Sequence, residues 1–309
     1  MRNKWLGALA LVSVTFMQFS CGGCNGGGGD ADIQFIPGDD KSAADVNYDS
    51  DAMNEVIGSF SSPVEMAATV EDSGVPFSTK YLANPETVKE YSSSFKKALG
   101  LGVLSADLGY LNVYSKTSQI LDYLVSIRGL TEDLKLGQFF DFGSLKRLAT
   151  SEDNLDSLQI MCTQSYQNMD EHLRNNQRSN LSVLLVTGVW VESFYLITQV
   201  TKEQSSKGEP SERLRETVGL QKNILNNLLP IVKLFKDTDK NFENLVQNLE
   251  ELKDVLSAAK ITEHVDNTMP ASEDGVIMQN EYSVVELSNE DLQEIITTTE
   301  KIRNKIIAL

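Results

Sequence analysis

Two acidic residues stand inside otherwise apolar, helix-forming stretches of the chain. Asp107 is spaced three and four residues from Leu104 and Leu111, and Glu192 is the single charged residue between 181 and 200. Residues three or four positions apart share one face of a helix, so we expect both acids to point into the protein. A carboxylate removed from water needs a partner or takes up a proton. The two acids are therefore the first candidates for a functional site.

Aromatic residues accompany these acids in both stretches. We predict a candidate pocket for a small ligand, lined by Asp107, Tyr110, Tyr114, Trp190, Glu192 and Tyr195. The same pattern also fits a buried hydrogen-bond network between the acids and the tyrosines, or helices rotated so that both acids face water. We favour the structural alternatives, because buried polar groups are usually satisfied by neighbouring protein groups.

The sequence lacks the residue patterns of metal sites, hydrolases, kinases and nucleotide-binding turns. Only two histidines and three cysteines are present, and no histidine pair has the spacing of a metal site. No G-x-S-x-G turn, P-loop or kinase signature occurs. Gly100 and Gly102 partly mimic a dinucleotide-binding turn, but they follow a helix instead of a strand and the third glycine is missing. We interpret them as a joint between two helices, and we expect no enzymatic activity, metal or cofactor.

The charge balance argues against nucleic acid as a partner. The chain has 44 acidic and 27 basic side chains, which gives a formal net charge of -17. Binding to phosphate backbones needs clustered lysine and arginine, and no such cluster is evident. The 41% of hydrophobic residues suffices for a core over most of the length.

The N-terminus has the layout of an export signal. Arg2 and Lys4 precede an uncharged apolar run from Trp5 to Phe19, and a glycine-rich stretch follows. A basic start, a short apolar run and a small residue before the cut are typical of a secretory signal peptide. The run is shorter than the roughly 20 residues that span a bilayer as a helix.

Ser20 and Cys21 directly follow this run and resemble the end of a lipobox, the cleavage motif of bacterial lipoproteins. The resemblance covers residues 1–24 and departs from the family at Gln18, where leucine is usual. It implies cleavage before Cys21 and lipidation of that cysteine, with a diacylglyceryl thioether and a fatty acid such as palmitate on the amine. The alternatives are lipidation at Cys24 and secretion without a lipid.

The same resemblance implies a location. Gly22 stands where lipoproteins retained in the inner membrane typically carry aspartate. The resemblance therefore implies a lipid anchor in the outer membrane of the cell envelope, and leaves open whether the body faces the periplasm or the cell surface.

Composition divides the chain into three parts. Residues 1–20 are the predicted signal peptide, residues 21–73 a flexible tether rich in glycine and acids, and residues 74–309 a helical-bundle domain. The tether has few apolar residues and no sustained period, so it cannot bury enough surface to offset its ordering entropy. A structured portion around residues 53–60 is the alternative.

We predict an all-α fold, a multi-helix bundle of about eight helices. The period of the apolar residues places the helices near residues 84–98, 103–128, 139–149, 151–172, 181–200, 211–236, 239–260 and 288–309. Residues 262–287 contain no lysine or arginine and are expected to form an acidic arm with a short strand pair at 276–285.

The stretch 181–200 is long enough to cross a membrane, but a helix at the centre of a bundle has the same composition. Glu192, Thr187 and Gln199 would be costly in lipid, so we favour a buried central helix. A weak internal similarity between residues 101–114 and 181–194 suggests two similar hairpins with these two helices at the centre.

The sequence therefore favours a non-enzymatic envelope lipoprotein whose helical body acts in protein binding or assembly. Long apolar stripes can pack inside the bundle or against partner helices. The alternative is a module that binds or senses a small molecule between the two central helices.

Overall fold

The computed structural model describes residues 46, 48–59, 69, 70, 72–149, 155–208, 210–266 and 280–308. The signal peptide, Cys21 and the tether up to residue 45 lie outside the described residues. What is described is an all-α multi-helix bundle with one β-hairpin, in agreement with the predicted fold class.

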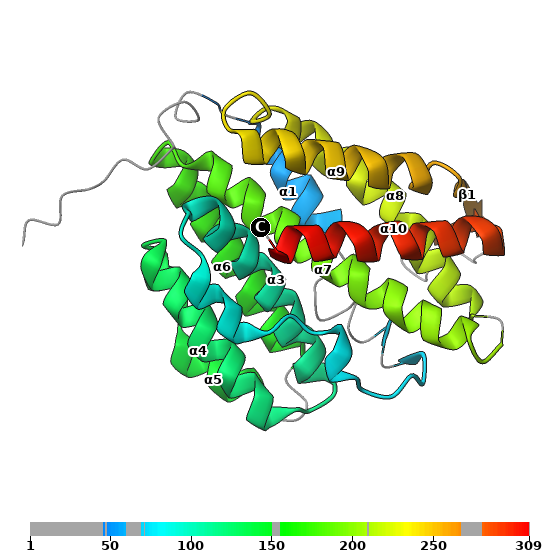
Figure 1. Cartoon of the computed structure of the whole chain (residues 1–309), viewed down its shortest axis with the longest axis horizontal. Coiled ribbons are helices and arrows are strands. Elements are labelled where there is room, and N and C mark those ends of the chain that lie inside the picture. The colour runs from blue at the N-terminus through cyan, green and yellow to red at the C-terminus, as the bar shows by residue number, and fades with distance from the viewer. Residues whose placement is uncertain are drawn as a thin grey trace, which may run out of the picture. The chain divides into compact units, whose positions relative to one another are not determined.

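Two helices form the centre of this bundle, α3 (Ser94–Val113) and α7 (Ser179–Ser205), and they pack against each other (Figure 1). Helix α7 is buried without interruption from Ser179 to Thr201. Among the described residues it is also the one helix long and apolar enough to cross a membrane, and that whole stretch is covered by protein. The prediction of a buried central helix is confirmed.

The remaining elements flank this pair. Helices α4 and α6 pack on α3 and α7 respectively and are joined by α5, while α8 and α10 pack on α7 and are covered by α9. Their bounds are α1 Ser50–Ser59, η1 Thr79–Tyr81, η2 Pro85–Glu90, α4 Thr117–Asp133, η3 Gly137–Phe139, α5 Phe142–Ala149, α6 Leu155–Asn175, α8 Glu212–Lys233, α9 Lys240–Leu256, β1 Lys260–Asp266, β2 Asn280–Glu286 and α10 Asn289–Ala308.

Glycines allow α3 and α7 to touch through their backbones. A Cβ atom at Gly102 would lie 2.1 Å from the carbonyl oxygen of Leu185, and one at Gly188 would lie 2.2 Å from that of Leu99. The crossing thus has no room for a methyl group on either side. The predicted helix joint at Gly100 and Gly102 is wrong, because α3 runs through both positions and Gly102 serves close approach instead.

The break in the chain comes later than predicted. Ser115 has a φ of 53°, in the left-handed region, and it separates α3 from α4 within the predicted helix 103–128. Because of this break, α4 does not continue the apolar face of α3. Leu121 and Val125 are therefore 37% and 72% exposed. The buried face of α4 consists of Ile120, Tyr123, Leu124, Ile127 and Leu130.

The folded body begins before residue 74, so the predicted end of the tether is wrong. Tyr48, Met53, Val56 and Val70 are all buried, and α1 packs against α8. The Tyr48 hydroxyl donates a hydrogen bond to the buried Asp170 of α6. These four apolar residues stand in an acidic segment and are too widely spaced to form a recognisable period, so the sequence pattern does not indicate their burial.

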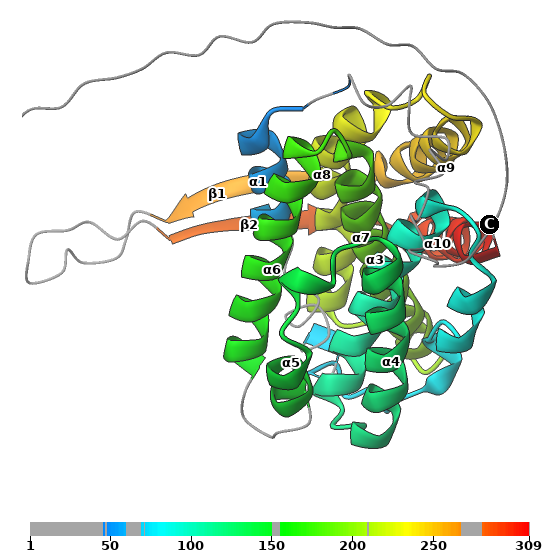
Figure 2. The same ribbon diagram turned by 90° about the vertical axis from the view of Figure 1, so that its left-hand side faces the viewer.

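The two strands form an antiparallel hairpin in which Lys260 lies opposite Glu286 and Asp266 opposite Asn280. The predicted strand pair within 276–285 is wrong, because β2 pairs with β1, which follows α9, instead of with a strand next to it in that range. Figure 2 shows both strands extending away from the helices. At the base, Val285 occupies the space beside Gly219 of α8, where a Cβ atom would lie 2.3 Å from its Cγ1.

The glycine crossing yields a prediction with a matched control. Gly102→Ala and Gly188→Ala should each lower the free energy of unfolding by about 1–3 kcal/mol, because the added methyl group meets backbone atoms. Gly129→Ala on α4, where nothing lies within 4 Å, should raise it by about 0.5–1 kcal/mol through helix propensity. Urea unfolding of the three variants measures both effects. Equal tolerance of all three substitutions would contradict the packing described.

Candidate functional site

Asp107 of α3 and Glu192 of α7 meet in the centre of the bundle. Both side chains are 0% exposed, and the two groups interact electrostatically, since the negative charge of Glu192 raises the pKa of Asp107. The expectation that both acids point inward is confirmed. Two like charges enclosed together repel each other, which favours a proton on one of the two carboxyl groups.

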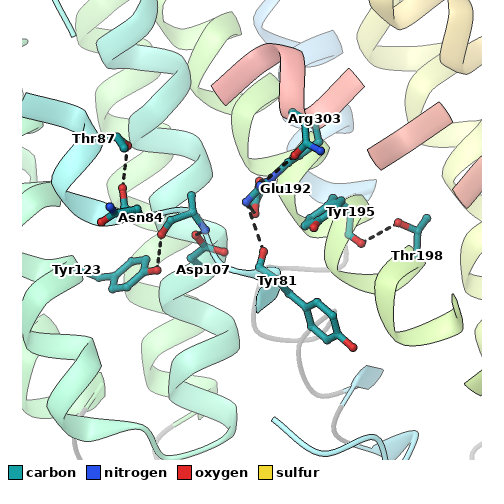
Figure 3. A network of polar contacts seen from close by, with 11 residues as sticks. Tyr81, Asn84, Thr87, Asp107, Tyr123, Glu192, Tyr195, Thr198 and Arg303 are labelled. Atoms are coloured by element: carbon teal, nitrogen blue, oxygen red, sulfur yellow. Dashed lines mark hydrogen bonds and ion pairs between the residues drawn. The ribbon is translucent and has the colours of Figure 1, made fainter. Parts of the chain in front are cut away.

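A third residue, Arg303 of α10, completes this site (Figure 3). Its Nε and Nη2 donate to the two carboxylate oxygens of Glu192 at 2.8 and 2.6 Å, a two-pronged ion pair that is almost fully buried. Nη2 also donates to the carbonyl oxygen of Tyr81 at 3.3 Å. The guanidinium carbon lies 4.4 Å from the centre of the Tyr195 ring, within the range of a cation–π contact.

Asp107 is bound from the other side by the segment between η1 and η2. Its Oδ2 accepts a hydrogen bond from the backbone nitrogen of Ala83 at 2.9 Å. The carbonyl oxygen of Ala83 accepts one from the Tyr123 hydroxyl at 2.5 Å. The other oxygen of Asp107, Oδ1, is buried, and no described group donates to it. Both polar groups of Ala83 are therefore fixed by side chains of the central region.

The charges of the site balance when Asp107 is neutral. Burial, and next the negative charge of Glu192, raise the pKa of Asp107 well above its ordinary value of 3.8. Burial alone would lower the pKa of Arg303, but the charge of Glu192 and the hydrogen bonds to it outweigh this effect and raise it. One guanidinium thus neutralises one carboxylate, and the second carboxyl group stays protonated.

The other residues of the candidate pocket do not all join this site. Tyr195 does, beneath Arg303. Tyr110 and Tyr114 instead hold the preceding segment, since the Tyr110 hydroxyl accepts from the backbone nitrogen of Ser78 at 3.0 Å and the Tyr114 hydroxyl donates to the carbonyl oxygen of Val75 at 2.7 Å.

Trp190 lies on another side of α7. Its indole nitrogen donates to Gln221 of α8 at 3.0 Å, and its ring stacks on Phe194 with the centroids 5.5 Å apart. The sequence pattern therefore combined three separate groups of side chains into one pocket.

Arg303 is not evident from the sequence as a core residue, because it lies in a helix with many exposed charged residues. One signal could have found it: Arg303 lies four residues after Thr299 and seven after Ile296, both buried. It therefore shares the apolar face of α10. Two buried acids in one core also require a cation, and Arg303 is a basic residue on such a face.

As a whole, the site is a satisfied internal network. Among the described residues, no group of three or more His, Cys, Asp or Glu side chains could hold a metal ion. The network links α3, α7 and α10 to the segment of Tyr81 and Ala83. Protein groups bind both oxygens of Glu192 and Oδ2 of Asp107, and Oδ1 of Asp107 is the oxygen left for a proton.

Comparison with known proteins gives no match for this chain among protein-family models, curated proteins or solved structures. The assignment of a function therefore depends on the chain's own residues.

The protonated state of Asp107 predicts an unusual dependence of stability on pH. Above the ordinary aspartate pKa the unfolded chain releases this proton while the folded protein keeps it, so wild-type stability falls with rising pH up to the folded pKa. Asp107→Asn can keep the hydrogen bond from Ala83 without a proton to lose. It should match the wild type near pH 4 and exceed its unfolding free energy by about 1 kcal/mol or more at pH 7.

Asp107→Ala is the control for this experiment. It removes the acceptor for the buried nitrogen of Ala83, so it should be about 1–3 kcal/mol less stable than Asp107→Asn at every pH, because neither variant has this proton to lose. Urea unfolding at several pH values measures all three proteins. If the difference between Asp107→Asn and the wild type did not change with pH, the proton on Asp107 would be disproved.

Proposed function

We propose that this chain is an exported lipoprotein, anchored through Cys21 in the outer membrane, whose helical body binds another protein of the cell envelope and catalyses no reaction. The lipobox-like Ser20–Cys21 supports export and lipidation. The satisfied network at Asp107 and Glu192 favours a structural role for the acids over catalysis. The β1–β2 hairpin, which extends from the helices, is the observation that carries the proposal of protein binding.

The hairpin is held firmly at its base. Arg215 of α8 donates to the carbonyl oxygen of Leu287 at 2.8 Å, just after β2. Lys222 donates to the carbonyl oxygen of Ala259 at 2.7 Å, just before β1. The arm therefore has a fixed origin on α8, which lowers the entropy cost of binding through it.

The strands present unpaired edges to a partner. Within the described part of the chain the sheet has two strands, so each strand has one edge without a neighbouring strand. Exposed edges readily accept a further strand. Val284 is 40% exposed beyond the contact of Val285 with α8. An isolated edge of this kind on an otherwise helical body suits the addition of an extended segment from another protein.

The charge of the hairpin indicates the chemistry of that segment. Its two strands contain four acids and one base in sequence, namely Glu263, Asp266, Glu281, Glu286 and Lys260. A basic extended segment would complement this charge, whereas a second copy of a chain with net charge -17 would be repelled.

A ligand between α3 and α7 has no comparable support. The two helices touch through backbone at Gly102 and Gly188, and both buried acids are bound by protein groups.

Lipidation can be tested with two serine variants. In cells of a Gram-negative host grown with an alkyne fatty acid, the wild type and Cys24→Ser should be labelled and recovered with membranes. Cys21→Ser should lose the label, because it lacks the sulfur that receives the diacylglyceryl group. If Cys24→Ser lost the label while Cys21→Ser kept it, the lipid would be attached to Cys24 instead. Absence of label in all three would reject the lipoprotein assignment.

Protein binding can be tested with two exposed valines. A photocrosslinking amino acid at position 284, on the hairpin, should give a discrete adduct with another protein in the native cells. The same amino acid at Val125 of α4, which is 72% exposed, should not give that adduct. The same adducts from both positions, or none from position 284, would contradict binding through the hairpin.

A further inference from the structure

We propose that a hollow between the segment of η1 and η2 and the start of α4 binds a small organic amine with a short apolar part. This inference is independent of the lipid anchor and of the hairpin. The hollow has a volume of about 510 Å³, which lies within the range of small-molecule sites. It is lined by Thr79, by residues 82–86 and, on α4, by Gln119, Asp122 and Tyr123.

The floor of the hollow is rigid. It is formed by Ala83 and Tyr123, which are 6% and 5% exposed. The Tyr123 hydroxyl holds the carbonyl oxygen of Ala83, and Asp107 holds the backbone nitrogen of the same residue. The floor is thereby tied to the buried network of the core (Figure 3), so that little ordering is needed when a ligand binds.

The lining favours a positive charge. It contains two carboxylates, Asp122 and Glu86, and no lysine or arginine. Glu86 is paired with Lys89, whereas Asp122 has no ion-pair partner among the described residues. An ammonium group would find its counter-charge at Asp122 and could donate further hydrogen bonds to the side-chain oxygen of Gln119.

The apolar part of the lining indicates the chemistry of the uncharged part of the ligand. Leu82 and Pro85 are half-buried and lie beside the covered ring of Tyr123. Together they offer a short apolar surface next to the carboxylate, which suits an alkyl chain of a few carbons. An anion would meet two carboxylates, and a fully polar cation would leave this surface unused.

The test is a calorimetric titration of the full-length chain, purified in detergent at low salt, with 1,5-diaminopentane. The matched neutral probe is 1,5-pentanediol, which has the same length and no charge. We expect saturable binding of the diamine at one site and no detectable binding of the diol.

Two charge variants locate the site. Asp122→Asn should weaken diamine binding about threefold to fivefold, as expected for the loss of one exposed ion pair. Asp254→Asn removes an aspartate on α9 that is also exposed and lies outside the hollow, and it should leave the affinity unchanged within twofold. Circular dichroism checks that both variants fold.

Three results would overturn the proposal. Absence of saturable binding would exclude the site. Equal weakening by Asp122→Asn and Asp254→Asn would assign the binding to the diffuse charge of the whole protein. Binding of the diol as strong as that of the diamine would show that the hollow does not select a cation.

Discussion

The guanidinium of Arg303 is the cation on which the interior of this bundle depends. Two carboxyl groups are fully buried at its centre, and a negative charge on both would be strongly destabilising. Arg303 neutralises Glu192, and Asp107 then remains protonated. Because Arg303 also binds Tyr81 and Asp107 binds Ala83, the arrangement fixes the C-terminal helix and the segment before α3 against one core.

The close approach of α3 and α7 explains why these acids meet. Backbone contact at Gly102 and Gly188 brings the helices together without intervening side chains. Asp107 lies five residues after Gly102, and Glu192 four after Gly188, so the acids come together just beyond the crossing. Both proposed binding sites lie outside this crossing, at the hairpin on α8 and at the hollow beside α4. The hollow shares Ala83 and Tyr123 with the core network, so its shape depends on the same interior contacts.

Sequence patterns predicted those features that depend on local spacing. The all-α class, the buried helix around Glu192 and the inward position of Asp107 follow from the apolar period, and each is confirmed. Features that depend on distant segments were missed or misplaced. Gly102 looked like a joint because its partner, Gly188, is 86 residues away in the chain. Arg303 is 111 residues from Glu192 and lies among charges that usually face water.

The central claim is that one proton resides on the buried pair, on Asp107, at neutral pH. Carbon-13 NMR of the protein labelled at aspartate carboxyl carbons tests it most directly, with Asp107→Asn used to assign the signal. We predict that the Asp107 signal keeps the chemical shift of a protonated acid from about pH 5 to about pH 7, where ordinary aspartates are ionised. If every aspartate signal had moved to the ionised shift by pH 5, Asp107 would carry a charge and the account of the core would be wrong.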